Sequence, residues 1–388
     1  MSTIGVLGGH WRATVTPSGA VEPWDGSPPL AWFIAADDRW HVPADEPTVR
    51  QRRIDGAPVL ETRIKVPSGD AVHRVWCVAD GGGFTVVEVE NDSTLPFAVA
   101  FDRNDLLSSR PPAAVPIQGI DLPANSIVLP VGHRATVRVA LSHAGGVAGA
   151  LPDHLSGPAQ VARGWTTVID AAGRMILPDA AITDHVAHLR AELALRGPVE
   201  PNVDAVGFLV DVGQLVRLGE RADAWVPDVA AAVAGVARLD PAWDVVAALD
   251  AAAIVLARAD EPRALRDLQR IRLSVTAPLP SSPPAGRELL WHEQRLARAT
   301  FGAAGPVADL LAAGIPETWW GANFEVHHLP VSVSGTVSYA VRWHGDRPAV
   351  LWETTGNDVR LTATSVAPDW HTDASAGEAL WPSPTRRV

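Results

Sequence analysis

Residues 323–328 place polar side chains of three chemical types on one face of a short extended segment. The segment reads Asn-Phe-Glu-Val-His-His, so in a strand Asn323, Glu325 and His327 point one way and the apolar residues between them point the other way. Side chains on one strand face follow each other at about 7 Å. A carboxylate between an amide and an imidazole can orient a hydroxyl group or activate water. The alternative is the solvated outer face of an edge strand.

Two further carboxylates stand beside tryptophan. Asp38 precedes Trp40 and His41 in the segment Asp-Asp-Arg-Trp-His, and Glu317 precedes a Trp-Trp pair. We expect Glu325 or Glu317 to be the general acid of a glycoside-processing site, and Asp38 or another acidic residue to be its partner. The separation of two such carboxyl groups decides the stereochemistry, with about 5 Å for retention and about 6.5–9.5 Å for inversion. For Asp38, a role in a turn is the alternative.

Tryptophan is unusually frequent. The chain has 15 Trp, 1 Tyr and 7 Phe, and the tryptophans gather in the first forty and the last seventy residues. A flat indole offers apolar area and an electron-rich face to the C–H groups of a sugar ring. The alternative is that the tryptophans fill hydrophobic cores. On the first interpretation we expect a saccharide to be bound by Trp24, Trp40, His41, Trp319, Trp320, Asn323 and His327.

Residues 1–150 are predicted to form an antiparallel β-sandwich. Short runs rich in Val, Thr and Ile are separated by turn signals rather than by helices, as is typical of sandwiches. The predicted strands cover residues 58–66, 71–79, 84–91, 95–101 and 133–141.

Residues 151–315 are predicted to form a domain of helical hairpins. Residues 179–196 repeat apolar side chains every three or four positions and end at Gly197-Pro198, a typical helix stop. Alanine-rich faces should let neighbouring helices approach closely. Further helices are expected over residues 204–218, 228–239, 242–258, 289–300 and 307–311, with a proline-rich connector at 276–286.

Residues 316–388 are predicted to form a small, tryptophan-rich β-domain. Residues 336–344 and 348–353 form a hairpin that turns at Gly345-Asp346, a strong turn dipeptide. The fold class is therefore α+β with three domains, and whether the β-segments at the two ends of the chain form one domain stays open.

Charge and composition exclude several classes of protein. Lys and Arg number 32 against 44 Asp and Glu, so the net charge is −12. Phosphate-rich partners need a basic surface, so we expect neither nucleic acid nor an anionic membrane as a partner. The start has neither the basic nor the apolar region of a signal peptide, and no apolar run reaches about 20 residues, so we expect a cytoplasmic protein. A single cysteine rules out an intrachain disulfide, and we expect no metal and no cofactor.

The order of these three parts resembles the six-hairpin glycosidases, bacterial carbohydrate-active proteins with an N-terminal β-sandwich. The segments that carry the resemblance are residues 87–91 (Val-Glu-Val-Glu-Asn), 95–97 (Leu-Pro-Phe) and 341–348 (Val-Arg-Trp-His-Gly-Asp-Arg-Pro). The resemblance implies hydrolysis or phosphorolysis of a glycosidic bond by a carboxylic acid and a group that activates water or phosphate. A complete ring of this type has twelve helices. About eight are expected here, so the ring is either partial or completed in a homodimer.

Three functions remain open from the sequence, one of which is a structural or assembly protein in which the tryptophans all lie in the core. Of the other two, the first is a glycoside-processing enzyme with its cleft between the helical and β-domains. The second is a non-catalytic protein of the same build that binds a saccharide or a protein. Exposed indoles without two converging carboxylates would favour the second.

Overall fold

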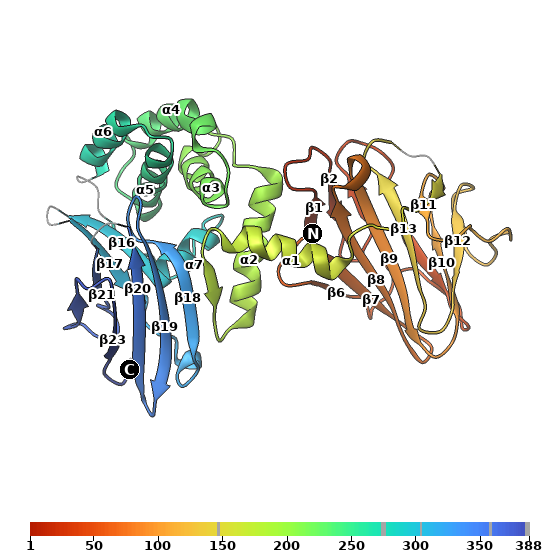
Figure 1. The fold of residues 1–388 in the computed structure, drawn as a ribbon. Helices are drawn as coiled ribbons and strands as arrows, with labels where there is room; N and C mark the ends of the chain where they lie inside the picture. Colours follow the sequence, from red (N-terminus) through yellow and green to blue (C-terminus); the bar gives the residue numbers. More distant parts are fainter. Residues whose placement is uncertain (146–147, 273–276, 303–304, 357–358, 385–388) are drawn as a thin grey trace. The chain divides into compact units, whose positions relative to one another are not determined.

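The computed structural model describes residues 1–145, 148–272, 277–302, 305–356 and 359–384. It confirms an α+β fold in which β-sheets precede and follow a helical region (Figure 1). The chain divides into two compact units, unit 1 (Met1–Thr166) and unit 2 (Thr167–Val388). The first helix, α1 (Pro158–Asp170), crosses this boundary. The finer division at residues 150 and 315 stays a prediction.

The described residues of unit 1 form three sheets, which are antiparallel apart from one strand pair. The first has the strand order β1-β2-β3, the second β12-β10-β4-β5 and the third β14-β11-β13-β9-β8-β7-β6. In the third sheet β11 and β14 pair in parallel, and all other pairs are antiparallel. The bounds are β1 (Ser2–Gly5), β2 (Arg12–Val15), β3 (Val21–Pro23), β4 (Trp32–Ala35), β5 (Trp40–His41), β6 (Arg50–Arg53), β7 (Leu60–Val66), β8 (Gly69–Val78), β9 (Phe84–Ser93), β10 (Phe97–Phe101), β11 (Leu107–Ser108), β12 (Ile127–Val131), β13 (Thr136–Ser142) and β14 (Gly149–Ala150).

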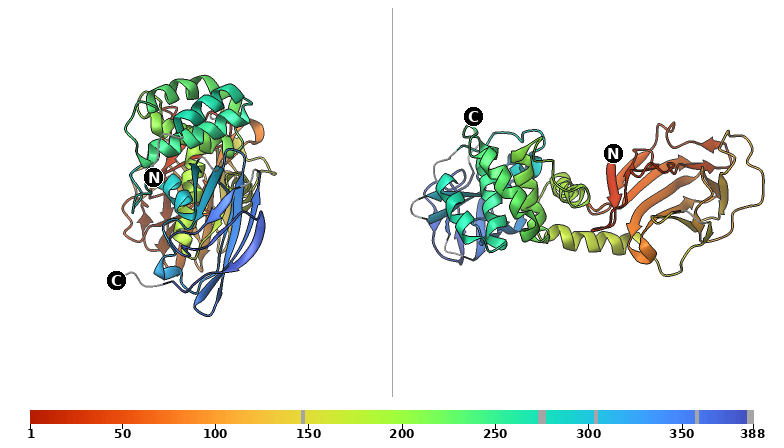
Figure 2. Two further views of the ribbon diagram at one scale, coloured as in Figure 1. Left: turned by 90° about the vertical axis from the view of Figure 1, so that its left-hand side faces the viewer. Right: turned by 90° about the horizontal axis from the view of Figure 1, so that it is seen from above.

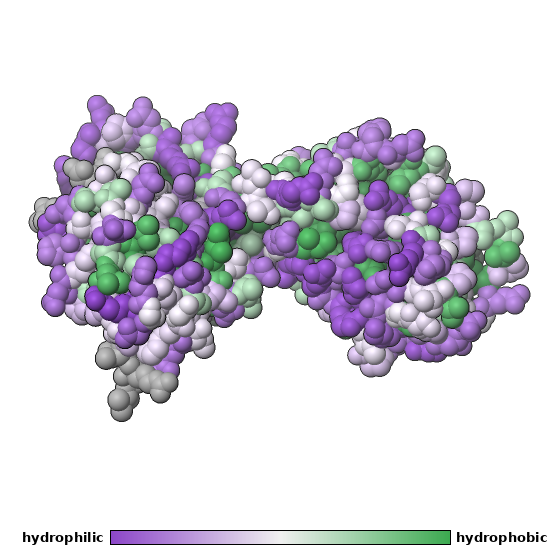
Figure 3. Space-filling view, turned by 60° about the horizontal axis from the view of Figure 1, so that its bottom comes forward, coloured by the Kyte–Doolittle hydropathy of each residue, from purple (hydrophilic) through white to green (hydrophobic). Residues whose placement is uncertain are grey.

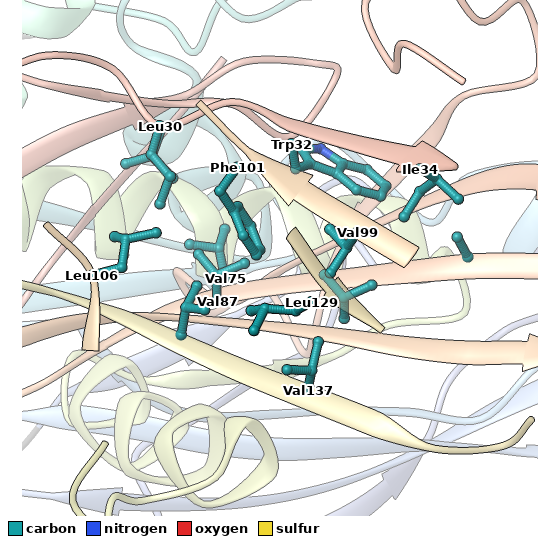
Figure 4. Close-up of a cluster of buried hydrophobic side chains, with 14 of the residues drawn as sticks. Leu30, Trp32, Ile34, Val75, Val87, Val99, Phe101, Leu106, Leu129 and Val137 are labelled. Atoms are coloured by element: carbon teal, nitrogen blue, oxygen red, sulfur yellow. The ribbon is translucent and has the colours of Figure 1, made fainter. Parts of the chain in front are cut away.

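The core of unit 1 lies between sheets whose inward side chains alternate along each strand. Ile34 and Val99 from the second sheet face Val75 and Val87 from the third, and all four are fully buried (Figure 4). This arrangement confirms the predicted sandwich. All five predicted strands are present as β7, β8, β9, β10 and β13, displaced by at most three residues at either end.

The helices of unit 2 follow the predicted caps closely. The side chain of Asp179 accepts hydrogen bonds from the first turn of α2, and Gly197 follows its last residue at φ 78°. The side chain of Asp204 caps α3 in the same way. These caps satisfy backbone N–H groups that a helix end leaves unpaired. The bounds are α2 (Ala180–Arg196), α3 (Ala205–Arg217), α4 (Val226–Val236), α5 (Trp243–Arg258), α6 (Pro262–Arg272) and α7 (Glu288–Leu296).

Helices α3 and α5 approach each other through small residues. A Cβ atom added at Gly213 would lie 2.7 Å from the Cβ of Ala251, closer than real Cβ contacts. The predicted close packing of alanine-rich faces is therefore present at this crossing. Figures 1 and 2 show α3 to α6 gathered at one end of the sheets of unit 2.

Unit 2 also contains two sheets, with the strand orders β15-β18-β19-β20-β23 and β16-β17-β21-β22. The predicted hairpin is confirmed, because β19 and β20 pair around Gly345-Asp346. The bounds are β15 (Arg174–Ile176), β16 (Ala297–Gly302), β17 (Gly305–Leu310), β18 (Phe324–Pro330), β19 (Thr336–His344), β20 (Arg347–Thr355), β21 (Arg360–Thr362), β22 (His371–Thr372) and β23 (Ala376–Leu380).

The helices predicted over residues 289–300 and 307–311 are partly wrong. Helix α7 ends at Leu296, and the following residues form β16, which pairs antiparallel with β17. Residues 307–311 fall in β17 and the turn after it, and β17 also pairs in parallel with β21. Long-range strand pairing has overridden the local helix preference of the alanines and arginines here.

Within the described parts of the chain, no helix combines the length and the apolar character needed to cross a bilayer. On the face drawn in Figure 3, apolar residues are scattered among hydrophilic ones on both units. Scattered apolar residues of this kind are ordinary on a protein surface. The expected cytoplasmic location stays a prediction.

The sandwich core generates a stability prediction. Replacing Ile34 by Ala should reduce the free energy of unfolding of unit 1 by about 2–5 kcal/mol, because a fully buried side chain leaves a cavity. The matched control is Val115→Ala, at a side chain that is 63% exposed, which should change stability by less than about 0.5 kcal/mol. Urea unfolding followed by circular dichroism measures both. Equal effects would contradict the assigned core.

Candidate functional site

The predicted polar face of residues 323–328 is present on β18. Glu325 and His327 are half-buried, and the apolar residues between and beside them are buried. The Glu325 carboxylate accepts hydrogen bonds from His327 Nε2 at 3.2 Å and from the guanidinium of Arg342 on the neighbouring strand. Arg342 and then His327 lower the pKa of Glu325 below its ordinary value. The group is therefore held ionised, which is the opposite of what a general acid needs.

Asn323 lies just before this strand and has a structural contact. Its Oδ1 accepts a hydrogen bond from the backbone N–H of Trp343 at 3.2 Å, and the indole of Trp343 donates to the carbonyl of Ala322 at 2.9 Å. Asn323 and Trp343 thus join the start of β18 to β19, and the side chain of Asn323 is exposed.

Glu317, Trp319 and Trp320 lie in and beside a short 3₁₀ helix, η3 (Glu317–Trp319). Glu317 is exposed. Trp319 is 2% exposed and packs edge-on against Phe324, with the guanidinium of Arg295 over its ring. In this structure the indole of Trp319 has no open face for a sugar. Trp320 is half-buried and donates to the carbonyl of Ile315 at 3.3 Å.

Asp38 and His41 belong to a hydrogen-bonded chain in unit 1. The buried imidazole of His41 contacts Asp38 at 3.0 Å through Nε2 and Glu46 at 2.8 Å through Nδ1, and Arg39 pairs with Glu46 at 2.7 Å. The hydrogen bond to His41 lowers the pKa of Asp38. The two carboxylates lie no more than about 8 Å apart, because two hydrogen bonds and one ring separate them. The ring fills the space that a glycosidic bond would need.

Most tryptophans serve the two cores. Trp24 is 48% exposed and Trp40 is half-buried, with its indole donating to the carbonyl of Gln118. These two are the predicted sugar contacts of unit 1 that keep an accessible indole. The buried tryptophans are Trp32, Trp76, Trp165, Trp243, Trp291, Trp319, Trp352 and Trp381.

Sequence reasoning missed a buried ionic cluster in unit 2 around Glu293 on α7. Glu293 is 4% exposed and accepts hydrogen bonds from Arg190 at 2.6 Å, from Arg217 at 2.6 Å and from Gln214 at 2.7 Å. Burial alone would raise the pKa of Glu293, but the charges of Arg217 and Arg190 bring it below its ordinary value. The cluster therefore contains an ionised carboxylate and two guanidinium groups away from water.

Part of this cluster lines a cavity between α3, α5, α7 and β16, which we call the Gln214 cavity. Its volume is about 70 Å³, which is room for about five water molecules at 10–15 Å³ each. Small apolar residues such as Ala247, Ala251 and Ile254 form much of its wall. Its polar lining residues are Gln214, Arg217, Asp250, Glu293, Gln294 and Ser332.

Two groups give the Gln214 cavity its chemical character. The Oε1 of Gln214 is buried and has no hydrogen-bond partner among the described residues, while its Nε2 is occupied by Glu293. Asp250 pairs with Arg272 at 2.6 and 3.1 Å, yet burial raises the pKa of Asp250 to about 6. The cavity lining thus includes a buried acceptor without a partner among the described residues and two carboxylates whose pKa values are shifted in opposite directions.

These residues carry a signal that the sequence does contain. Gln214 and Arg217 interrupt the apolar run of α3, and Asp250 interrupts an alanine-rich run in α5. A polar group on an apolar helix face must find a buried partner, since burying it alone costs about 1–3 kcal/mol. The sequence does not show which helices bring those partners together.

The chain matches no model of a protein family and no curated protein. The geometry of its own residues is therefore the basis for choosing between candidate sites. The Gln214 cavity is a partly enclosed site with a mixed apolar and polar lining that includes two carboxyl groups of perturbed pKa, which makes it a candidate ligand site.

The buried cluster generates a prediction that separates it from the surface pair on β18. Glu293→Gln should reduce the free energy of unfolding of unit 2 by about 3–5 kcal/mol, because it leaves two buried guanidinium groups without their counter-charge. The same change at the more exposed Glu325 should cost no more than about 1 kcal/mol. Urea unfolding of both variants provides the comparison, and similar losses would argue against the assignment.

Proposed function

We propose that the chain binds a small saccharide unit in the Gln214 cavity. The observation that carries the proposal is the buried Oε1 of Gln214, which has no partner among the described residues and belongs to a side chain that lines a cavity together with two carboxylates. An acceptor left unpaired in a buried site costs stability unless a ligand or ordered water donates to it. A ligand rich in hydroxyl groups supplies such donors.

The wall of the cavity supports a saccharide over other hydroxylated molecules. Apolar side chains such as Ile254 and Leu290 alternate with the polar groups. A pyranose ring presents C–H groups on its faces and hydroxyl groups at its edge, so it uses both kinds of surface. Gln294 is held in place because its Oε1 accepts a hydrogen bond from the buried indole of Trp243 at 2.6 Å. The amide N–H₂ group of Gln294 therefore has a fixed orientation.

This proposal keeps the carbohydrate expectation and moves the site. Arg342 holds the predicted general acid Glu325 ionised, which does not support proton donation, and Asp38, predicted as the partner of the acid, is engaged by His41. Relatedness to the six-hairpin glycosidases, with a partial helical ring, stays part of the proposal. The homodimer that would complete the ring is likewise part of the proposal.

Binding of sugars should depend on the amide of Gln214. Glucose, galactose, mannose, maltose and cellobiose, each at 100 mM or less, are the probes for a thermal-shift measurement of the full chain. We expect at least one to raise the melting temperature of unit 2 by a few degrees. Gln214→Met keeps the size of the side chain, removes the acceptor and should weaken that binding at least tenfold.

Gln269→Met is the matched control, because Gln269 is exposed on α6 and does not line the cavity. It should respond to sugars like the unmodified chain. A flat response of the unmodified chain to every probe, or equal responses of the two variants, overturns the proposal.

A second function, cleavage of a glycosidic bond, is favoured by the opposed pKa values of Asp250 and Glu293. A carboxyl group with a pKa of about 6 is partly protonated near neutral pH, and the ionised carboxylate of Glu293, which lines the same cavity, can stabilise positive charge on the sugar. Asp250 is then the general acid that protonates the leaving oxygen.

Hydrolysis of maltose or cellobiose should reveal this role through its pH dependence. The acid must be protonated, so the rate should fall about tenfold per pH unit above about pH 6. Asp250→Asn should lower the rate on these disaccharides by about 10²–10⁴-fold. It should lower the rate on a 4-nitrophenyl glucoside much less, because that leaving group needs no proton.

Glu325→Gln, Glu317→Gln and Asp38→Asn are the comparison variants, and they should keep the unmodified rate. A large loss in any of them, with Asp250→Asn active on disaccharides, returns the acid role to the carboxylates expected from the sequence.

A further inference from the structure

A second cavity in unit 2, of about 280 Å³, adjoins the Gln214 cavity. We call it the Arg258 cavity. The two cavities share Arg217, Ile254, Pro330, Ser332 and Val333 in their walls. The remaining polar lining of the Arg258 cavity is Arg258, His328, Ser334 and Thr336.

The Arg258 cavity differs from its neighbour in charge. Two guanidinium groups and an imidazole line it, and no acidic side chain stands among the described residues of its wall. Arg258, in the last turn of α5, donates one N–H to the carbonyl of Val216 at 2.6 Å. Its remaining donors meet no carboxylate among the described residues. Arg217 is paired with Glu293, so Arg258 supplies the charge beside this cavity that has no carboxylate partner among the described residues, and an anion would neutralise it.

The loop that follows β18 adds hydrogen-bond donors to the same wall. The Oγ of Ser332 accepts from the backbone N–H of Gly335 at 2.7 Å, so its hydroxyl hydrogen can be donated elsewhere. The backbone N–H groups of Val333 and Ser334 donate to no acceptor within the part of the chain that the structure describes. Consecutive N–H groups in a turn make a small anion-binding concavity.

An irregularity in β18 brings an imidazole to this wall. The strand carries a bulge between Val326 and Leu329, and His328 within it has φ of 57°. A bulge redirects a side chain out of the regular alternation, and a left-handed conformation of histidine is uncommon enough to suggest a functional reason. His328 is exposed and lines the Arg258 cavity.

We propose that the Arg258 cavity binds a phosphate group, held by Arg217, Arg258 and His328 and by donors of the Ser332–Gly335 loop. Planar guanidinium groups match phosphate oxygens, and phosphate carries about −1.5 to −2 charges near neutral pH. The shared wall lets one ligand occupy both cavities, so the phosphate is either free or esterified to the saccharide. This last step rests on the proposed saccharide site, whereas the anion site itself does not.

Isothermal titration of the full chain with inorganic phosphate, glucose 1-phosphate, glucose 6-phosphate and glucose tests the proposal. We expect inorganic phosphate to bind, and Arg258→Met to weaken it at least tenfold. Arg238→Met is the matched control, because Arg238 is exposed after α4 and lines neither cavity. That variant should bind within about twofold of the unmodified chain, and raised salt should weaken binding in both.

The four ligands separate this proposal from the saccharide proposal. If the Gln214→Met variant binds phosphate as the unmodified chain does, the result supports the anion site even if no sugar binds. If a sugar phosphate binds more tightly than free phosphate, and if Arg258→Met and Gln214→Met each weaken that binding in part, the bound phosphate is a sugar ester. Equal affinities for a sugar phosphate and for inorganic phosphate identify the ligand of the Arg258 cavity as free phosphate. Absence of phosphate binding, or equal affinities of Arg258→Met and Arg238→Met, overturns the anion site.

Discussion

The burial of Glu293 is the constraint on which unit 2 depends. A carboxylate that is 4% exposed must be fully paired, because leaving it alone in the protein interior costs several kcal/mol. Its partners come from two other helices, Arg190 from α2 and Gln214 and Arg217 from α3. The three helices therefore have to meet at one point, and their ends are fixed by chemistry as well as by apolar packing.

The same constraint explains where the cavities lie. Side chains of Arg, Gln and Glu between helices cannot pack as densely as interlocking apolar residues, so space remains beside them. Gly213 brings α3 close to α5 on one side, and the ion cluster holds α3 near α7 on the other. The Gln214 cavity lies between these two contacts. Arg217 ends up in the walls of both cavities, so a ligand in either one changes the surroundings of the same guanidinium group.

Sequence patterns predicted the parts that local physics decides. Asp179 and Gly197 bound α2 as expected, and alternation placed Glu325 and His327 on one side of β18. The patterns failed where distant pairing decides, as in β16, whose alanine and arginine content favours a helix until β17 pairs with it. The Glu293 cluster was missed for the same reason. Glu293 lies more than seventy residues in sequence from each of its partners, and only the packing of α2, α3 and α7 brings them together.

Buried polar groups in this chain fall into two kinds, and the difference locates function. The terminal nitrogens of Arg190 are used by the fold, because besides pairing with Glu293 they donate to the carbonyls of Ile169 and Gly173, which follow the last turn of α1 or lie in it, while its Nε has no partner among the described residues. Such carbonyls have no partner within a helix, so Arg190 caps α1. His41 is likewise used on both nitrogens by Asp38 and Glu46. Groups of the second kind, such as Gln214 Oε1, are positioned by the same framework but not used by it among the described residues. Since a fold gains nothing from leaving them unpaired, a ligand is the physical reason to keep them.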